Sequence, residues 1–185
     1  ETVPKGKTEE DNVVLREVGK NPKPSNMISH VDLLEKLDLA DTERAGKISG
    51  ARHYFLKNQL VVLDMALLRF ALDILVKKGY QPIQPPFMMR QEPYEGVTDI
   101  KDFEDVMYKI EDEDLYLIAT SEHPMAGMHM DEIIMEENLP IKYAGVSTCF
   151  RKEAGAHGKD TKGIFRVHQF NKVEQFVFCK PEDSW

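Results

Sequence analysis

The sequence has few residues of the kinds that define disulfide-rich, membrane-spanning or metal-binding proteins. Its 185 residues include two cysteines, Cys149 and Cys179, and two thiols alone make a poor zinc site. A hairpin centred near Gly158 would set Cys149 opposite about position 167, so we expect no disulfide with Cys179. No apolar run has the length of a membrane span, and the N-terminus does not resemble a signal peptide. We therefore expect a cytoplasmic protein with no membrane partner and no metal ligands among its side chains.

The chain is acidic, and the sequence patterns of the common phosphate-binding loops are missing from it. The formal net charge is -8, and 42% of the residues are hydrophobic. The acidity argues against a large non-specific nucleic-acid surface, while the apolar content is enough for the core of one domain. Neither G-x-x-x-x-G-K-[ST] nor G-x-G-x-x-G occurs, which excludes a phosphate loop between a strand and a helix.

Two segments of the chain differ in character. Residues 1–26 are charged and interrupted by prolines, which is typical of a linker or a loosely packed edge. Residues 27–185 have the periodic patterns of a folded unit. In this unit, Ser29 begins a capping box that predicts a short helix. Residues 58–78 predict a long helix, buried on most of its circumference, with Gly79 at its C-terminal end. Such a helix packs on a sheet, and a second subunit is a further candidate to cover it.

Strand patterns dominate the rest of the chain. The proline-rich segment at residues 80–88 suits an edge strand, and a helix is expected from about Pro124 to about Glu136. Residues 106–110 and 115–119 predict an antiparallel hairpin, and residues 142–151 and 165–179 predict two further strands. This order predicts an α+β fold in which helices flank an antiparallel β-sheet.

The segment CFRKEAGAHGKDTKGIFRVHQFNKVE, residues 149–174, is basic although the chain is acidic. In a strand, residues two apart share a face, so one face would carry Arg166, His168, Phe170, Lys172 and Glu174. Arg151 and Glu153 would lie on the partner strand. Guanidinium groups match phosphate or carboxylate oxygens, a phenyl ring stacks on a purine, and a carboxylate binds an amine. The combination predicts a site for a nucleotide and an amino acid; the alternative is a solvated hairpin with ion pairs.

Part of this segment, FRKEAGAHGKDTKGIFRVHQFNKVEQF, resembles motif 2 of the class II aminoacyl-tRNA synthetases, in the version typical of the seryl-tRNA synthetase family. GYQPIQPPFM resembles motif 1, in which Pro86 would lie at the dimer interface. LIATSEHPMAGMH resembles the Thr-x-Glu stretch that binds serine. The family's coiled-coil tRNA-binding arm and its motif 3 are not found in this sequence. The resemblance therefore implies the N-terminal portion of a class II catalytic domain in residues 27–185.

The resemblance also assigns roles to individual residues. Arg151 would be the catalytic residue, bridging the α-phosphate of ATP and the carboxylate of serine. The ATP-binding residues would be Arg151, Lys152, Glu153, Arg166, Val167 and Phe170. The serine-binding residues would be Thr120, Ser121, Glu122, Arg151 and Glu174. A loop containing His157, Lys159 and Lys162 would contact the acceptor end of tRNA.

The function implied by the resemblance is that of a serine–tRNA ligase. Such an enzyme activates L-serine with ATP and Mg2+ and then charges serine tRNA, and it works as a homodimer. Two alternatives are compatible with the same residues. One is a synthetase-like ligase that passes a small amino acid to a carrier protein, and the other is a catalytically silent paralogue that binds nucleotide.

Overall fold

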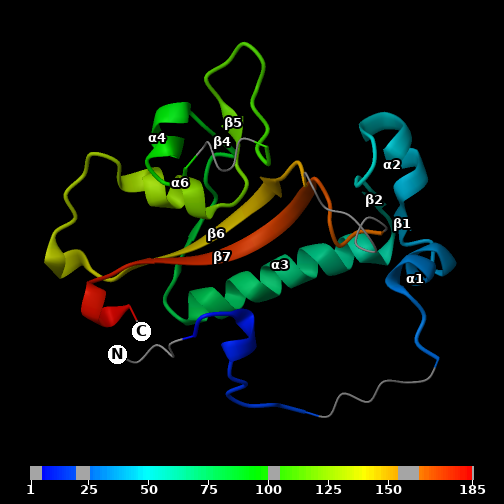
Figure 1. The fold of residues 1–185 in the computed structure, drawn as a ribbon, viewed down its shortest axis with the longest axis horizontal. Coiled ribbons are helices and arrows are strands. Elements are labelled where there is room, and N and C mark those ends of the chain that lie inside the picture. The colour runs from blue at the N-terminus through cyan, green and yellow to red at the C-terminus, as the bar shows by residue number, and fades with distance from the viewer. Residues whose placement is uncertain (1–5, 20–25, 100–104, 154–162, 185) are drawn as a thin grey trace.

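A three-stranded sheet lies at the centre of the fold, between a long helix and a group of short elements. The computed structural model describes residues 6–19, 26–99, 105–153 and 163–184. The sheet has the strand order β3 (Gln81–Ile83), β6 (Ile141–Phe150) and β7 (Gln169–Phe178). Helix α3 (Gln59–Lys77) lies along one face of the sheet, and helices α4 (Gln91–Glu95) and α6 (Glu122–Ala126) lie on the other side (Figure 1).

The hairpin of β6 and β7 is the longest strand pairing among the described residues. Ten residue pairs run from Ile141 opposite Phe178 to Phe150 opposite Gln169. Both strands were predicted, but β7 begins four residues later than expected. Cys149 consequently faces Phe170 across the ladder instead of a residue near position 167. Both cysteines are free thiols, as expected from their spacing.

Strand β3 pairs with β6 in parallel, with Gln81 opposite Tyr143. The edge position expected for this proline-containing segment is confirmed within the described sheet. The parallel direction was not predicted. The parallel direction is possible because β3 and β6 are joined by a long connection, residues 84–140, which brings the chain back to the same end of the sheet before β6 begins. The α+β class is confirmed, with one parallel pairing in an otherwise antiparallel sheet.

Helix α3 packs on the sheet through half-buried residues four apart, including Leu60, Asp64 and Leu68. Asp64 accepts a hydrogen bond of 3.0 Å from the side-chain amide of Asn171 in β7, which marks the sheet-facing side. The helix ends before Gly79, whose φ of +82° suits glycine. The expectation that α3 is buried on most of its circumference is wrong for this chain alone. Its exposed apolar residues are Val61, Val62, Leu63, Met65, Leu67, Phe70, Ile74 and Val76.

The second face of the sheet is covered by a small apolar core. This core contains Met89, Tyr94, Met107, Tyr116 and Ile118, and it is built around β4 (Met88–Met89) and β5 (Tyr116–Leu117). These two strands pair antiparallel. The hairpin expected between residues 106–110 and 115–119 is reduced to one bridge, between Lys109 and Tyr116, with neighbouring backbone hydrogen bonds.

The helix expected from Pro124 to Glu136 is much shorter than predicted. Helix α6 ends at Ala126 and is followed by the 3-10 turns η2 (Gly127–His129) and η3 (Glu136–Asn138). The imidazole of His129 lies 2.9 Å from the hydroxyl of Tyr143 in β6, and Asp131 has a φ of +60°. A continued α-helix is incompatible with this left-handed residue, so the contact with the sheet replaces the helical turn.

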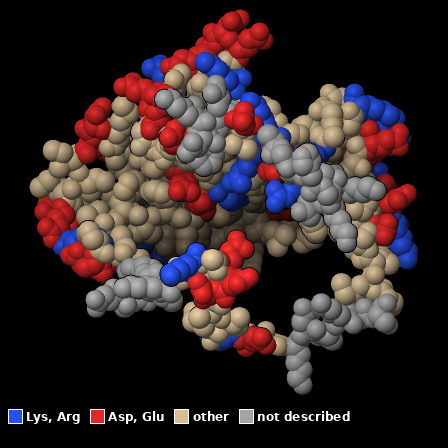
Figure 2. All heavy atoms as spheres, in the orientation of Figure 1, with Lys and Arg blue, Asp and Glu red and all other residues tan. Residues whose placement is uncertain are grey.

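The remaining elements lie at the N-terminal side and at the end of β7. They are η1 (Glu9–Asp11), α1 (His30–Lys36), β1 (Ala40–Asp41), α2 (Thr42–Ser49), β2 (Phe55–Leu56) and η5 (Pro181–Asp183). Ser29 caps α1 by accepting a hydrogen bond from the backbone of Asp32, as its sequence predicted. Acidic side chains are scattered over the face seen in Figure 2, in agreement with the negative net charge. No helix in the described ranges is long and apolar enough to cross a bilayer.

Gly145 of β6 lets helix α6 approach the sheet closely. A Cβ atom at this position would lie 2.7 Å from the methyl carbon of Met125 and 3.0 Å from the hydroxyl of Ser121. We expect Gly145→Ala to lower the free energy of unfolding by about 1–3 kcal/mol, because these buried groups must move. Thermal denaturation of the variant and the parent protein measures this difference.

Gly46 provides the matched control for this substitution. It lies inside α2, and a Cβ atom there would meet nothing within 4 Å. Gly46→Ala should stabilise the protein by about 0.5–1 kcal/mol, because alanine loses less backbone entropy in a helix. Equal effects of the two substitutions would contradict the close packing of α6 on β6.

Candidate functional site

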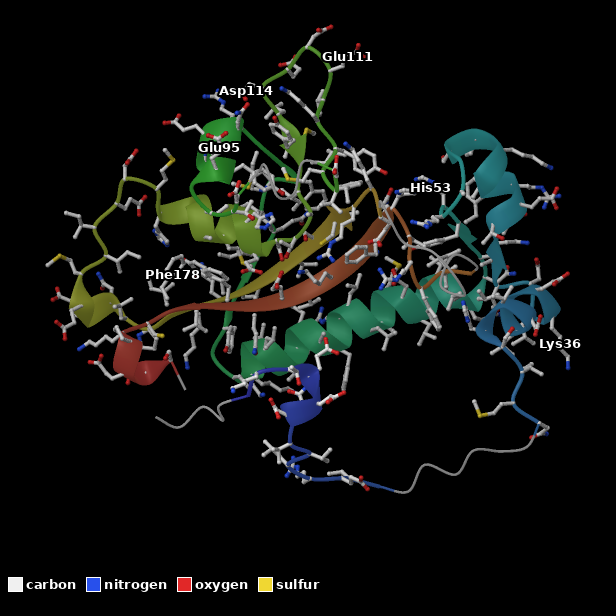
Figure 3. The ribbon with its side chains drawn as sticks, viewed as in Figure 1. Lys36, His53, Glu95, Glu111, Asp114 and Phe178 are labelled. Atoms are coloured by element: carbon white, nitrogen blue, oxygen red, sulfur yellow. The ribbon has the colours of Figure 1, made fainter. Side chains whose placement is uncertain are left out.

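The candidate site lies on the face of the hairpin that is opposite α3. Phe170, Lys172 and Glu174 alternate along β7 and share this face, as the sequence predicted. The neighbouring residue Asn171 points to the other side, where it contacts α3. His53 and Phe178, labelled in Figure 3, lie toward opposite ends of the hairpin and so mark the length of this face.

Arg151 follows directly after β6, and its side chain extends onto this face. Its Nε atom donates a hydrogen bond of 3.2 Å to the carbonyl of Ala119. Its guanidinium carbon lies 5.3 Å from the centre of the Phe170 ring, within the range of a cation–π contact. The guanidinium group is therefore held by a backbone carbonyl on one side and an aromatic ring on the other.

The backbone of Arg151 is fixed by His168 through two contacts. The N–H of Arg151 donates to the carbonyl of His168 at 2.9 Å, and Nδ1 of His168 lies 2.9 Å from the carbonyl of Arg151. A carbonyl can only accept, so Nδ1 carries the proton in this contact. The hydroxyl of Tyr108 lies 2.7 Å from the same nitrogen and accepts from it as well. Tyr108 and His168 thus set the position from which the Arg151 side chain starts.

A hollow of about 470 Å³ opens beside Arg151 and Phe170. It is lined by Tyr54, Arg151, Glu153, Ile164, Phe165, Arg166, Val167 and Phe170. The structure thus brings together five of the six residues that were predicted to bind ATP. The sixth, Lys152, has an exposed side chain and a backbone N–H bonded to the carbonyl of Val106 at 2.8 Å. Its side chain does not line this hollow.

Two details of this hollow differ from expectation. Arg166 and His168 precede β7 instead of lying within it, and Glu153 lies beyond the end of β6 with a φ of +50°. Glu153 forms an ion pair of 3.3 Å with Arg166, its neighbour in the lining of the hollow. Tyr54 was missed by the sequence reasoning. Its hydroxyl bonds to the carbonyl of Gln169 at 3.4 Å, 115 residues further along the chain, and no local pattern signals such a distant contact.

The second part of the site surrounds the carboxylate of Glu174. Its Oε2 atom accepts hydrogen bonds from the hydroxyls of Thr120 at 2.6 Å and Ser121 at 3.2 Å. Both hydroxyl residues are buried. The expected grouping of Thr120, Ser121 and Glu174 is therefore present in the structure. Glu122, the other residue predicted for serine binding, has an exposed side chain at the start of α6.

The electrostatics of this part depend on its partial burial. Burial raises the pKa of Glu174, but hydrogen bonds from Lys172 and Thr120 outweigh it, so the pKa is lowered below its usual value. Glu174 is consequently an anion at neutral pH. Burial also lowers the pKa of His123 to about 4, so this imidazole is neutral. The neutral ring lies 2.8 Å from the hydroxyl of Tyr94, which also accepts a hydrogen bond from the N–H of Ala119.

The other predicted site residues lie apart from this face or outside the described residues. His157, Lys159 and Lys162 belong to residues 154–162, which the structure does not describe. Pro86 is exposed and lines an apolar hollow of about 410 Å³ together with Pro85, Met88 and Pro124. In the described part of the chain, no three His, Cys, Asp or Glu residues are grouped to hold a metal ion.

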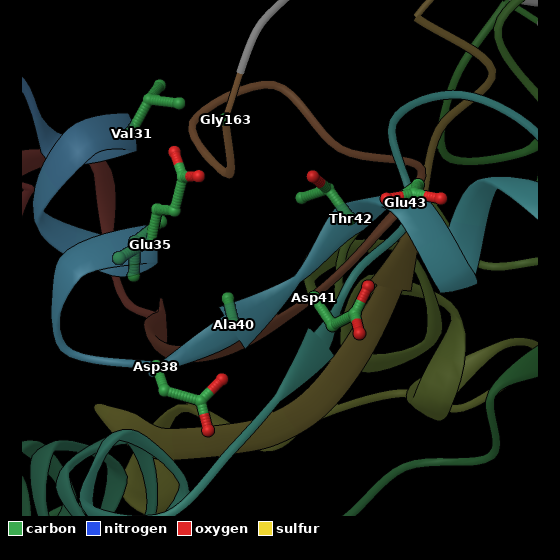
Figure 4. A pocket seen from close by; sticks show the side chains of 9 residues that line it. Val31, Glu35, Asp38, Ala40, Asp41, Thr42, Glu43 and Gly163 are labelled. Carbon is green, nitrogen blue, oxygen red and sulfur yellow. The ribbon is translucent and has the colours of Figure 1, made fainter.

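A further hollow of about 280 Å³ lies between α1 and α2 and is lined mainly by acidic and small residues (Figure 4). Three of its four carboxylates have cationic partners, because Asp38 pairs with Lys57, Asp41 with Arg44, and Glu43 with Lys47. The hollow beside Arg151 differs in having a guanidinium group over an aromatic ring. The Arg151 hollow is therefore the better candidate for binding an anionic ligand.

Comparisons with known proteins agree with this site. The family model "tRNA synthetase class II core domain (G, H, P, S and T)" matches residues 107–185. A serine–tRNA ligase of Picrophilus torridus is 66% identical over 157 residues, which are 85% of this chain and 35% of that protein. A serine–tRNA ligase of Methanoregula boonei is 59% identical over 187 residues, covering 100% of this chain and 44% of that protein. The chain thus spans less than half the length of these relatives.

Two solved structures are similar along most of the chain. The seryl-tRNA synthetase of Pyrococcus horikoshii complexed with ATP has a TM-score of 0.81 and 64% identity, covering 84% of this chain and 35% of that chain. The cytoplasmic serine–tRNA ligase of Naegleria fowleri in complex with AMP has a TM-score of 0.87 and 48% identity, covering 95% and 43%. Fold and site together define a class II aminoacyl-tRNA synthetase core. Within that class, the chain belongs to the seryl-tRNA synthetase family.

The low pKa of His123 predicts a specific dependence of stability on pH. The imidazole has a pKa of about 4 in the folded protein and about 6.5 in an unfolded chain, so the unfolded chain binds the proton first. Its contribution to stability is complete above pH 6.5 and is lost as the pH falls toward 4. Between pH 6.5 and 4, the free energy of unfolding should fall by about 1–2 kcal/mol less in His123→Gln than in the parent protein. This figure allows for the partial contact of the ring with water. Denaturation curves recorded between pH 4 and 7.5 measure it.

Tyr94→Phe is the control for this prediction. It deletes the hydroxyl that bonds His123 but keeps the ring that buries it. Because burial is the main cause of the low pKa, Tyr94→Phe should keep most of the pH dependence while lowering stability at every pH. If the loss of stability toward pH 4 persists in His123→Gln, groups other than His123 cause it.

Proposed function

We propose that the protein containing this chain is a serine–tRNA ligase, which activates L-serine with ATP and transfers it to serine tRNA. The observation that carries the proposal is the position of Arg151. Its guanidinium group lines the hollow that contains Phe170, and it also bonds to Ala119, the residue before Thr120. One cation thus lies between a pocket suited to a nucleotide and a carboxylate suited to an ammonium group.

The proposed reaction uses this position directly. The carboxylate of serine attacks the α-phosphorus of ATP, a C–O–P bond forms, and the bond to the leaving pyrophosphate breaks. Arg151 contacts both reacting groups and stabilises the negative charge that develops on the phosphoryl oxygens. Because a guanidinium group can donate to two oxygens at once, it holds the carboxylate and the phosphate within reacting distance.

The other residues bind the two ends of the intermediate. Phe170 stacks on the adenine ring, Glu153 accepts from the adenine amino group, and Arg166 contacts the triphosphate. Val167 contributes its backbone, and Lys152 adds positive charge near the nucleotide. At the other end, the ammonium group of serine binds Glu174 with Thr120, Ser121 and Glu122. The two similar structures are complexes with ATP and with AMP, which supports a nucleotide site.

Several finer assignments belong to the same proposal. Residues 27–185 form the N-terminal portion of a class II catalytic domain, and residues 1–26 form a linker or edge. His157, Lys159 and Lys162 contact the acceptor end of tRNA, and the protein works in the cytoplasm. Mg2+ accompanies ATP, and because the described residues offer no group of three His, Cys, Asp or Glu ligands, the phosphates would supply most of its ligands.

Exchange of labelled pyrophosphate into ATP tests the first half-reaction in the complete natural polypeptide. We expect exchange with serine and much less with glycine or alanine, followed by charging of serine tRNA. Exchange that is fastest with glycine or alanine, without tRNA charging, would instead indicate a ligase acting on a carrier protein. ATP binding without any exchange would indicate a silent paralogue.

Arg151→Lys should reduce the rate of exchange far more than it weakens ligand binding. Lysine keeps the charge but cannot contact phosphate and carboxylate with one planar group, so we expect a loss of about 2–4 kcal/mol of transition-state stabilisation. Exchange kinetics should show a lower kcat with a smaller change in KM. Arg44→Lys, at an exposed arginine of α2 that pairs with Asp41, is the control and should leave the kinetics unchanged. An unchanged kcat in Arg151→Lys would show that Arg151 has a structural role and does not stabilise the transition state.

The exposed apolar side of α3 supports a homodimer. Met65 and Phe70 are 66% and 65% exposed, and large exposed apolar patches mark interaction sites. Pro86, in the segment that resembles motif 1, would contribute to the same interface. We expect sedimentation velocity to show a dimer, and Phe70→Glu to raise its dissociation constant at least about tenfold. Ile133→Glu, at a residue 91% exposed outside α3, should have no such effect. A monomer at high protein concentration would contradict the proposal.

A further inference from the structure

The side chain of Lys172 occupies the space between Thr120 and Glu174. Its Nζ atom lies 2.5 Å from Oε2 of Glu174 and also donates to the hydroxyl of Thr120. The Lys172 side chain is 26% exposed and that of Glu174 is 20% exposed, so the pair is shielded from most of the solvent. Lys172 is thus a close cationic partner of the carboxylate that is proposed to bind serine.

The contacts at Oε2 of Glu174 leave little room for a second cation at that oxygen. Oε2 of Glu174 accepts from Thr120 at 2.6 Å, from Ser121 at 3.2 Å and from Lys172 at 2.5 Å. A carboxylate oxygen has two lone pairs, so three donors already exceed its ordinary capacity. The ammonium group of an amino acid could bind at this oxygen only if one of the three donors leaves. Thr120 and Ser121 have short, buried side chains, whereas Lys172 has a long flexible stem.

The ammonium group of lysine has the same chemistry as the α-ammonium group of an amino acid. Each carries one positive charge and three N–H donors, and each is satisfied by a carboxylate and a hydroxyl. We propose that Lys172 occupies the ammonium subsite when no amino acid is bound, and that serine displaces it from Glu174 and Thr120. This inference rests on the proposed function, because it takes Glu174 as the acceptor of the substrate's ammonium group.

Lys172 has two effects on the site when no amino acid is bound. It neutralises Glu174, which would otherwise be a shielded carboxylate without a cation and would destabilise the fold. It also makes ammonium binding an exchange of one cation for another, so ligand affinity includes the free energy of displacing Lys172. If Lys172 occupies the subsite nine-tenths of the time, its removal should tighten binding about tenfold.

Lys172→Met tests the displacement, because methionine keeps the stem and removes the charge. Serine binding to the complete polypeptide is measured by calorimetry at pH 7.5. We expect the dissociation constant for serine to fall about tenfold in Lys172→Met. The Tm without ligand should also fall, because Glu174 has lost its partner. Binding of ATP should change less than twofold, which shows that the variant is folded.

Methylammonium provides a second measurement that does not depend on enzymatic activity. Lys172→Ala leaves space for this small cation beside Glu174. Millimolar methylammonium should raise the Tm of Lys172→Ala, should leave the parent protein unchanged, and should be displaced by serine. Lys142→Met is the matched control, because Lys142 is also half-buried in the sheet but lies over the ring of Tyr80. This control should show neither tighter serine binding nor any response to methylammonium.

Two results would overturn the inference, and a third would overturn the proposed serine site itself. Unchanged serine affinity in Lys172→Met, with no methylammonium response in Lys172→Ala, would overturn the inference and make the ion pair structural. Loss of serine binding in Lys172→Met would also overturn it, because Lys172 would then be a ligand of the substrate. Glu174→Gln separates the inference from the function: if this variant binds serine as tightly as the parent protein, the proposed serine site itself is wrong.

Discussion

The antiparallel register of β6 and β7 is the constraint on which the rest of the site depends. Ten consecutive pairs place Phe170, Lys172 and Glu174 on one face, and the ladder continues into the paired backbones of Arg151 and His168. A slip of one residue would turn each of these side chains toward α3. The guanidinium group of Arg151 would then lose the ring of Phe170. Backbone pairing, and not the charges themselves, therefore brings these charges together.

The two faces of the hairpin are used differently. One face is packed against α3 through contacts such as Asn171 with Asp64, while the other carries polar groups around a hollow. Gly145 allows α6 to come close enough for Ser121 to reach Glu174. The site thus combines a rigid scaffold with a small number of shielded charges, an arrangement that holds ligands in a defined orientation.

Most long elements of the fold could be predicted, because their patterns are local. The apolar run of α3, the serine cap of α1 and the alternation in β6 and β7 were each visible in the sequence. The wrong predictions concern segments that long-range contacts control. His129 bonds to Tyr143 and lies 5.2 Å from the ring of Phe178, and these contacts end the helix expected as far as Glu136. The apolar run of α3 predicted a buried helix, but periodicity does not show which surface covers it, and the described part of this chain leaves one apolar side of α3 exposed.

For the site, the sequence by itself determined which residues of β7 share a face and that a guanidinium group, a phenyl ring and a carboxylate lie near one another. This follows from the period of two in a strand, which needs no knowledge of the rest of the fold. Only the tertiary structure decided that Tyr54 joins the hollow, that Glu122 is exposed, and that Thr120 and Ser121 bond to Glu174 across more than 50 residues of chain. Such contacts depend on how separate segments pack together, and no local pattern specifies that packing.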